Sequence, residues 1–157
     1  MAAQQSTLQT NDIRSRIPHA HPENAQQPEA RAQRRALADI RTGIWHYDAV
    51  HAPDAYDPVE RYIAQARYHI GKVWGYDERR QPLYGFTLMY HYRVSRDGRI
   101  WWVNNPELIT WQARGANHRG LGLCTDLGEG MSEAGAADPG AGGLYARPLR
   151  LALLRAA

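Results

Sequence analysis

The sequence is poor in cysteine and in long apolar runs, and each of these shortages excludes a class of protein. Its 157 residues include one cysteine, Cys124, so neither an internal disulfide nor a Cys-x-x-Cys metal or redox motif can form. No stretch approaches the roughly 18 apolar residues of a membrane-spanning helix, so we expect no membrane insertion. The first ten residues are polar and lack the basic start and apolar core of a secretory signal. We therefore expect synthesis in the cytoplasm.

The positive charge comes almost wholly from arginine, because Lys72 is the single lysine among 19 basic residues. The net charge of +3 is mild, and the basic residues form no dense run. An anionic partner, either nucleic acid or a cell-wall polymer, is compatible with this balance. The sequence has no base-stacking motif and no helix-turn-helix pattern, so we expect no nucleic-acid binding.

Composition divides the chain into three parts. Residues 1–41 are rich in Gln, Ala, Pro and Arg without a sustained apolar period, which predicts a loose N-terminal arm. Residues 42–130 carry the periodic segments of one domain. Residues 131–157 turn to Gly, Ala, Pro and Arg and predict a low-complexity tail, with a short helix near its end. We expect one folded domain and a monomer.

The middle part predicts one long helix. An aspartate that can cap the helix and a proline suited to its first turn stand at 57–58, and apolar residues follow at steps of three and four. We expect this helix to end near Gly75 and a loop to occupy 76–85. The apolar stripe consists of Val59, Tyr62, Ile63, Ala66, Ile70, Val73 and Trp74.

Strand signals lie on both sides of this helix. We expect a core strand over 43–50, a hairpin over 88–103 with its turn at 96–98, and a buried strand over 121–127. The residues expected on one face of the hairpin are Leu88, Tyr90, Tyr92 and Val94. The order β, α, β, β, β predicts an α/β fold with a mixed central sheet packed by helices.

A few side chains in this pattern are able to carry chemistry. His46 lies on a strand face where its imidazole could meet a metal, and the alternative is a hydrogen-bonded core histidine. The default role of Tyr90 is core packing with its hydroxyl at the rim. Trp111 could stack on a sugar ring or pack in the core. Cys124 lies in an apolar strand that disfavours its thiolate, so we interpret it as an inert core residue.

Four segments of the chain together resemble one known family. Residues 43–50, 56–70, 89–98 and 115–124 are similar, in this order, to the zinc-dependent N-acetylmuramoyl-L-alanine amidases of the bacteriophage lysozyme and peptidoglycan-recognition type. The resemblance covers about residues 40–130, and parts of the N-terminal segment resemble the lead-in of some phage and prophage members. It implies a mixed sheet packed by helices, a zinc site, and a groove that binds peptidoglycan.

The resemblance also implies roles for single residues. His46 matches a zinc ligand, and Tyr90 matches a tyrosine that assists catalysis. The groove is expected to include Trp111, Gln112 and Asn117. The implied reaction is hydrolysis of the amide bond between N-acetylmuramic acid and L-alanine, with zinc lowering the pKa of a bound water. Such a protein acts on the cell wall, as a phage lysin or a virion-associated hydrolase.

The sequence departs from the family at the other two zinc ligands. These are a histidine and a cysteine or aspartate near the family's C-terminus, whereas no histidine follows His118 and no cysteine follows Cys124. Asp126 and Glu129 are the carboxylates that could replace them. The change of composition after Gly130 suggests a truncated or frameshifted relative. We therefore expect an amidase, active or descended from active forms, or alternatively a peptidoglycan-binding module without the metal.

Overall fold

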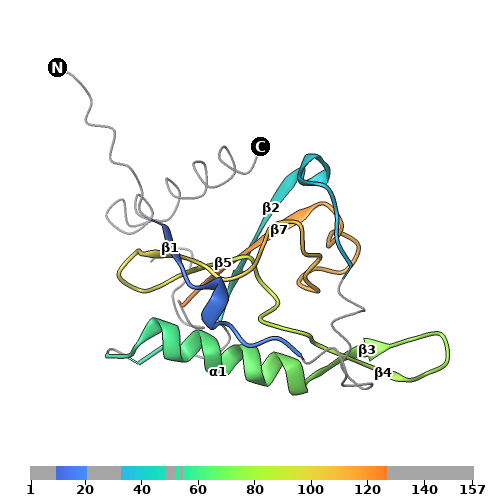
Figure 1. Ribbon diagram of the computed structural model, residues 1–157, viewed down its shortest axis with the longest axis horizontal. Helices are drawn as coiled ribbons and strands as arrows, with labels where there is room; N and C mark the ends of the chain where they lie inside the picture. The colour runs from blue at the N-terminus through green and yellow to red at the C-terminus, as the bar shows by residue number, and fades with distance from the viewer. Residues whose placement is uncertain (1–9, 21–32, 49–51, 54, 127–157) are drawn as a thin grey trace.

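The computed structural model describes residues 10–20, 33–48, 52–53 and 55–126. In this part of the chain a five-stranded sheet is covered on one face by helix α1 (Figure 1), and a two-stranded hairpin follows the helix. The strands of the sheet are β1 (Thr10–Asp12), β2 (Thr42–Tyr47), β5 (Tyr92–Val94), β6 (Ile100–Trp102) and β7 (Gly120–Thr125). The other elements are α1 (Pro58–Gly71), β3 (Val73–Tyr76), β4 (Pro82–Tyr84) and the 3-10 turns Arg14–Arg16 and Leu37–Asp39.

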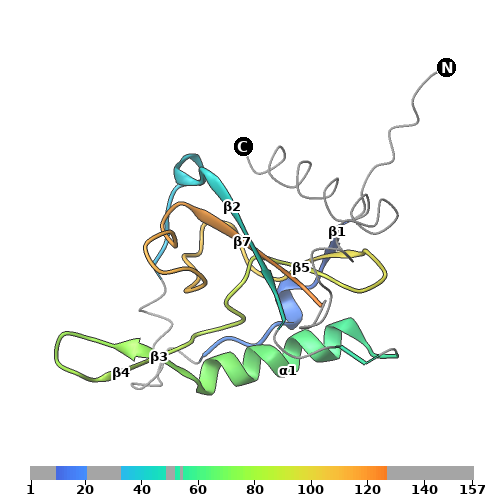
Figure 2. The same ribbon diagram turned by 180° about the vertical axis from the view of Figure 1, so that it is seen from behind.

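The sheet is mixed, in the order β1-β6-β5-β7-β2, which confirms the predicted fold class. Strand β7 runs parallel to both of its neighbours, β5 and β2, and all six of its residues are buried, as the apolar run predicts. Strands β5 and β6 form the predicted antiparallel hairpin, with Gly98 at a φ of 80° in its turn. Figure 2 shows β1 and β2 at the two opposite edges of the sheet.

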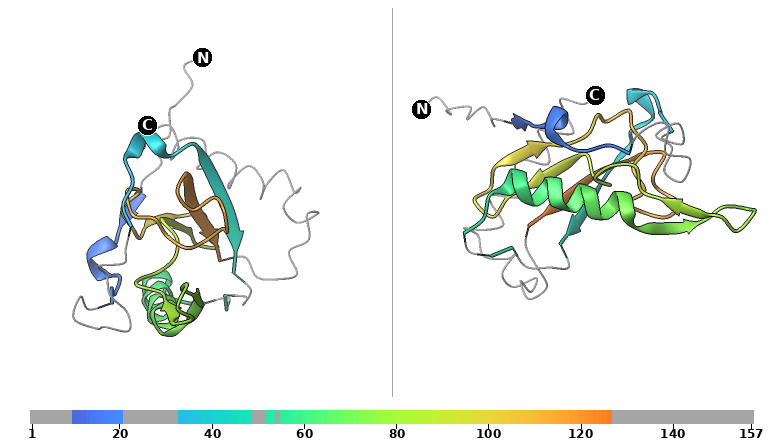
Figure 3. Two further views of the ribbon diagram at one scale, coloured as in Figure 1. Left: turned by 90° about the vertical axis from the view of Figure 1, so that its right-hand side faces the viewer. Right: turned by 60° about the horizontal axis from the view of Figure 1, so that its bottom comes forward.

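Strand register decides which side chains meet α1. His46 is aligned with Cys124, Cys124 with Arg93, and Arg93 with Trp101, so these four share one face. Trp101 packs with the buried face of α1, which identifies this as the helix side (Figure 3). Tyr92 belongs to the opposite face, where it stacks on Trp102 and packs with Leu121 and Leu123. The prediction that Tyr92 shares a face with Leu88 and Tyr90 is therefore wrong.

Helix α1 begins where the sequence predicts and ends earlier. Asp57 accepts hydrogen bonds from the backbone N–H groups of Val59 (2.8 Å) and Glu60 (3.3 Å), as an N-cap does. The helix stops at Gly71 instead of near Gly75, because the next residues pair as β3 with β4. β-branched and aromatic residues in this segment suit a strand. The predicted loop over 76–85 accordingly contains the turn and second strand of a hairpin.

The N-terminal segment is part of the fold where the structure describes it. Strand β1 adds to the sheet edge beside β6, and Ile13 and Ile17 pack in the core between α1 and the sheet. Arg35 is buried as well. A loose arm therefore does not describe residues 10–20 and 33–41. A three-residue strand is too short to show the alternation from which a strand is predicted.

Strand β2 is an edge strand, whereas the sequence predicts a core strand. Its outer face leaves Trp45 39% and Tyr47 61% exposed. The hairpin also starts later than predicted, at Tyr92. The side chain of Asn104 donates to the carbonyl oxygens of Leu88 (2.5 Å) and Tyr90 (2.7 Å), so these two carbonyls are bonded to a side chain.

Two further predictions concern membrane insertion and the C-terminal tail. No helix among the described residues is long and apolar enough to cross a membrane. The predicted tail over 131–157 lies outside the described residues.

Candidate functional site

His46 and Tyr90 lie side by side on the helix side of the sheet. Their ring centroids are 5.2 Å apart, and both side chains are half-buried. The Nε2 atom of His46 is buried and has no hydrogen-bond partner among the described residues. Burial lowers the pKa of His46, so the imidazole is neutral at neutral pH. A neutral imidazole with an unused nitrogen is able to bind a metal ion or exchange a hydrogen bond with a ligand.

Tyr90 is held by its surroundings as a protonated phenol. Burial, followed by the neighbouring Cys124 side chain, raises the pKa of its hydroxyl. Its ring lies 5.9 Å from the ring of His69 and 5.6 Å from the guanidinium carbon of Arg93. The phenol is thus a hydrogen-bond donor in a fixed place beside His46.

His69 is a positioning residue that the sequence analysis did not single out. Its Nδ1 accepts a hydrogen bond of 3.0 Å from the backbone N–H of Met89, which precedes Tyr90. Burial, with the charges of Arg93 and Lys72, lowers the pKa of His69 to about 4, so the ring stays neutral. The signal for its burial was present in the sequence, because His69 follows Ala66 by three residues on the apolar stripe of the helix.

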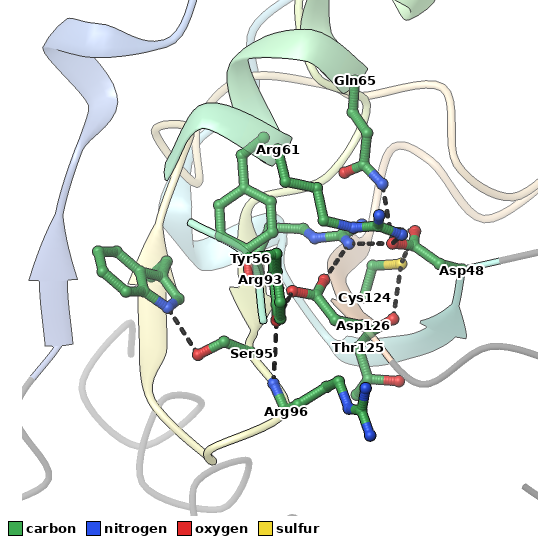
Figure 4. Close-up of polar contacts among 12 residues, drawn as sticks. Asp48, Tyr56, Arg61, Gln65, Arg93, Ser95, Arg96, Cys124, Thr125 and Asp126 are labelled. Atoms are coloured by element: carbon green, nitrogen blue, oxygen red, sulfur yellow. Dashed lines mark hydrogen bonds and ion pairs between the residues drawn. The ribbon is translucent and has the colours of Figure 1, made fainter. Parts of the chain in front are cut away.

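A buried charge network adjoins the pair, and Figure 4 shows its centre at Arg93. Arg93 is fully buried and donates to Asp48 through both terminal nitrogens, at 2.9 and 2.5 Å. It also donates to Asp126. Burial alone would raise the pKa of Asp48, but Arg93, Gln65 and Arg61 hold that pKa below its ordinary value. Both carboxylates are therefore structural counter-charges.

Asp126, which the sequence analysis offered as a replacement zinc ligand, is part of this network. Besides Arg93, it accepts hydrogen bonds from the hydroxyls of Tyr56 (2.5 Å) and Tyr62 (2.7 Å). Both of its oxygens thus have protein partners, and its role as a replacement zinc ligand stays a prediction. Glu129, the other candidate carboxylate, lies outside the described residues.

Cys124 is the inert core residue that the sequence predicts. It is fully buried, and its Sγ lies 3.5 Å from an oxygen of Asp48. Burial raises the pKa of the thiol to about 12, so the thiolate is not populated at neutral pH.

The three predicted groove residues lie in one loop between β6 and β7. Trp111 is half-buried and packs edge-on against Phe86, with ring centroids 5.8 Å apart. Gln112 lies across β7, where a Cβ on Gly122 would fall 1.4 Å from its Oε1. Asn117 closes the loop, because its Oδ1 accepts from the backbone N–H groups of Gln112 (3.0 Å) and Ala113 (2.7 Å).

These contacts give each loop residue a structural task, and their substrate roles stay predictions. The Nε2 of Gln112 donates to the carbonyl oxygen of Gly120 at 3.0 Å, and its Oε1 is buried without a partner in the described part of the chain. Gly122 precedes Cys124 by two residues on β7, so Gln112 lies on the same face of the sheet as His46. Of the three, Gln112 is therefore the one best placed to reach a ligand near His46.

The zinc site implied by the resemblance is not completed by the described residues. Across 10–20, 33–48, 52–53 and 55–126, no group of three or more His, Cys, Asp or Glu side chains could hold a metal ion. His46 supplies one suitable nitrogen, while Cys124 and Asp126 are used in the network. A zinc site has at least three protein ligands, and of these the described residues supply one nitrogen, that of His46.

Comparison with known proteins gives the fold. No protein-family model matches this chain, and neither does any curated protein. Among solved structures, the chain is similar to bumblebee PGRP-SA, with a TM-score of 0.62 and 11% identity over 94% of this chain and 76% of that one. It is also similar to the Drosophila peptidoglycan recognition protein SD, with a TM-score of 0.56 and 15% identity over 80% and 66% of the two chains.

A more distant likeness concerns amidases. The endolysin N-acetylmuramoyl-L-alanine amidase LysCS from Clostridium intestinale aligns with 13% identity and a TM-score of 0.44, over 74% of this chain. The chain spans 57% and 58% of the lengths of this amidase and of LysC from the same organism. The likeness to the two peptidoglycan recognition proteins, both with TM-scores above 0.5, shows a common fold, with the same mixed sheet and helix.

Proposed function

We propose that this chain binds peptidoglycan, with the surface around His46 and Tyr90 as its recognition site. The observation that carries the proposal is the buried Nε2 of His46, which has no hydrogen-bond partner among the described residues and lies beside a protonated phenol. A buried polar atom without a partner costs stability, and a ligand that supplies the partner recovers it. The likeness of the fold to peptidoglycan recognition proteins supports the choice of ligand.

The chemistry of the pair suits a peptide stem on a glycan. The Tyr90 hydroxyl can donate to an amide carbonyl oxygen, and the neutral His46 can accept from or donate to the neighbouring amide. Both groups are neutral, so they would bind uncharged amide groups without the cost of burying an ion. Gln112, on the same face, offers a further amide for recognition.

Hydrolysis of the amide between N-acetylmuramic acid and L-alanine is the second candidate function. The arrangement that favours it is the same imidazole nitrogen beside the Tyr90 phenol, which could stabilise negative charge developing on a carbonyl oxygen. If bound, zinc would activate water and polarise the carbonyl. Of the described residues, His46 is the one that we assign to a zinc site. We therefore rank recognition above hydrolysis as the proposed function.

Two assays on the same protein separate the candidates. Co-sedimentation with insoluble peptidoglycan measures binding, and the appearance of new alanine amino termini measures hydrolysis, each with added zinc or with a chelator. Recognition predicts binding that a chelator does not change, and no release. Chelator-sensitive release would support the amidase, and the absence of both binding and release would overturn both candidates.

Matched variants place the binding at the proposed site. His46→Ala and Tyr90→Phe should weaken co-sedimentation, because each removes a polar group from the pair. Tyr47→Ala is the control, since Tyr47 neighbours His46 on β2 but lies on the exposed opposite face. Equal binding by His46→Ala and the parent would show that the ligand binds elsewhere.

A further inference from the structure

A polar cleft lies at the β1 edge of the sheet, opposite the β2 edge that carries His46. It has a volume of about 490 Å³ and is lined by residues of the β1 segment, by His19 and Arg34, and by the start of the loop after β6. Strands β1 and β2 are the two edges of the five-stranded sheet, so this cleft and the His46 surface are separate sites. The volume falls within the range of small-molecule sites, about 300–1,000 Å³.

One wall of the cleft is a fixed guanidinium. The guanidinium carbon of Arg14 lies 3.5 Å from the ring centroid of Trp102, a stacked cation–π contact. Its Nε and one terminal nitrogen donate to Asp12 at 2.9 and 2.7 Å, and its other terminal nitrogen donates to Asn105. Asn105 also lines the cleft, and because its side-chain oxygen accepts from Arg14, its NH₂ group remains as a donor.

The cleft is also lined by a cation without an ion-pair partner in the described part of the chain. Within the described ranges, the side chain of Arg34 is exposed and makes no hydrogen bond or ion pair, although its backbone bridges to Leu108. Two arginines and one aspartate line the cleft, so these three residues together contribute a formal charge of 2 − 1 = +1. The hydroxyl of Ser15 adds a neutral donor.

We propose that this cleft binds an oxyanion, a carboxylate or phosphate group of a polar ligand, with Arg34 as its main charged contact. A guanidinium matches the geometry of either oxyanion through two parallel N–H groups. Arg14, already held by Asp12 and Trp102, loses little conformational freedom when the ligand arrives. The donors of Ser15 and Asn105 contribute hydrogen bonds that a bare counter-ion such as chloride would use less well. The site is independent of peptidoglycan binding at His46.

Titration of the ¹⁵N-labelled chain by NMR tests the proposal with two probes, inorganic phosphate and acetate. We expect saturable shifts of the Arg34 Nε–H and the Asn105 amide with at least one probe. Arg34→Gln should weaken that binding about tenfold, the factor that corresponds to about 1.4 kcal/mol of lost charge-assisted hydrogen bonding. Preference for phosphate identifies a phosphate-bearing ligand, and preference for acetate a carboxylate.

The controls remove effects of ionic strength and net charge. Arg67→Gln changes the charge equally at an exposed position on α1, away from the cleft, and should bind the probe as the parent does. Ser15→Ala should weaken binding by a smaller factor than Arg34→Gln. Identical shifts with sodium chloride at matched ionic strength, or parent-like binding by Arg34→Gln with an unchanged amide spectrum elsewhere, would overturn the proposal.

Discussion

The Arg93 network and the His46–Tyr90 pair lie on the same face of the sheet. They differ in whether their buried polar atoms have hydrogen-bond partners. Around Arg93, all four carboxylate oxygens of Asp48 and Asp126 have hydrogen-bond partners. Two residues before Asp48, the Nε2 of His46 is buried with none among the described residues. Buried atoms without a partner also occur inside the network, at the Nε of Arg93 and the Oε1 of Gln65, but the other polar atoms of these side chains are hydrogen-bonded. Among the described residues the imidazole of His46 has no such second bond, so a ligand can supply the partner that its Nε2 lacks. The comparison separates what maintains the fold from what is available for function.

The largest expected effect on stability comes from removing Arg93, the centre of the buried network. Arg93→Ala leaves Asp48 and Asp126 buried without their shared counter-charge, and we expect the free energy of unfolding to fall by about 3–5 kcal/mol. Urea denaturation followed by circular dichroism measures this loss. Arg67→Ala, which removes an exposed arginine from α1, should change stability by less than about 0.5 kcal/mol. A loss below about 1 kcal/mol for Arg93→Ala would show that the network is energetically neutral.

A second histidine sharpens the comparison, because His91 is buried with both ring nitrogens in use. Its Nδ1 accepts from the backbone N–H of Gly122 at 2.9 Å, and its Nε2 donates to the carbonyl oxygen of Leu108 at 2.8 Å. Burial lowers the pKa of His91 to about 4, although the bond to Leu108 raises it, and the nearby Arg35 lowers it further. The native ring is therefore neutral where the unfolded histidine takes up a proton.

The lowered pKa of His91 predicts a pH dependence of stability. Its contribution is complete above the unfolded pKa of 6.5 and is lost as the pH falls from 6.5 towards 4, since the unfolded state then binds more protons. The full loss is about 3 kcal/mol at 1.36 kcal/mol per pH unit. His91→Asn keeps an acceptor for Gly122 but cannot titrate, so its unfolding free energy should fall less over this range. Equal slopes in parent and variant would contradict the assignment.

A smaller effect is expected from removing one hydroxyl of the network. Tyr62→Phe deletes the bond of 2.7 Å to Asp126 and keeps the packing of the ring, so we expect a loss of about 2 kcal/mol, as for hydrogen bonds to charged groups. Tyr68→Phe is the control, because Tyr68 is 63% exposed on the same helix. Thermal denaturation of both variants measures the difference. Equal melting temperatures would show that Asp126 does not need this donor.

The sequence predicted the parts of this comparison that local pattern records. The Asp57 cap, the helix start and the buried strand β7 follow from residues close in sequence, and the structure confirms them. The network could not be foreseen, because Arg93 lies 45 residues from Asp48 and 33 from Asp126. An arginine in a predicted strand is ordinarily placed on its solvent face. Only the sheet order shows that this strand is covered by α1.

The candidate site was predicted only in part, because some of its contacts join segments that are distant in the sequence. His46 and Tyr90 were named from the resemblance, and the structure brings them to 5.2 Å from each other. The positioning by Asn104 and His69 was missed, since each acts on the backbone of a distant segment. The role of residues 10–20 and 33–41 was also missed. Arg35, for example, donates to the carbonyl oxygens of Asn117 (2.7 Å) and Gly120 (2.8 Å), contacts between segments that no local period reveals.

The smallest expected effect on stability comes from substituting His46. His46→Leu removes the buried nitrogen that lacks a partner and keeps an apolar side chain against Tyr90, so the unfolding free energy should stay within about 1 kcal/mol of the parent. The same variant should lose peptidoglycan binding, since leucine cannot form a hydrogen bond with the ligand. Stability and co-sedimentation measured on one preparation decide the matter. A loss above about 2 kcal/mol would mean that His46 belongs to the structural network after all, whereas unchanged stability with lost binding identifies its nitrogen as the atom reserved for the ligand.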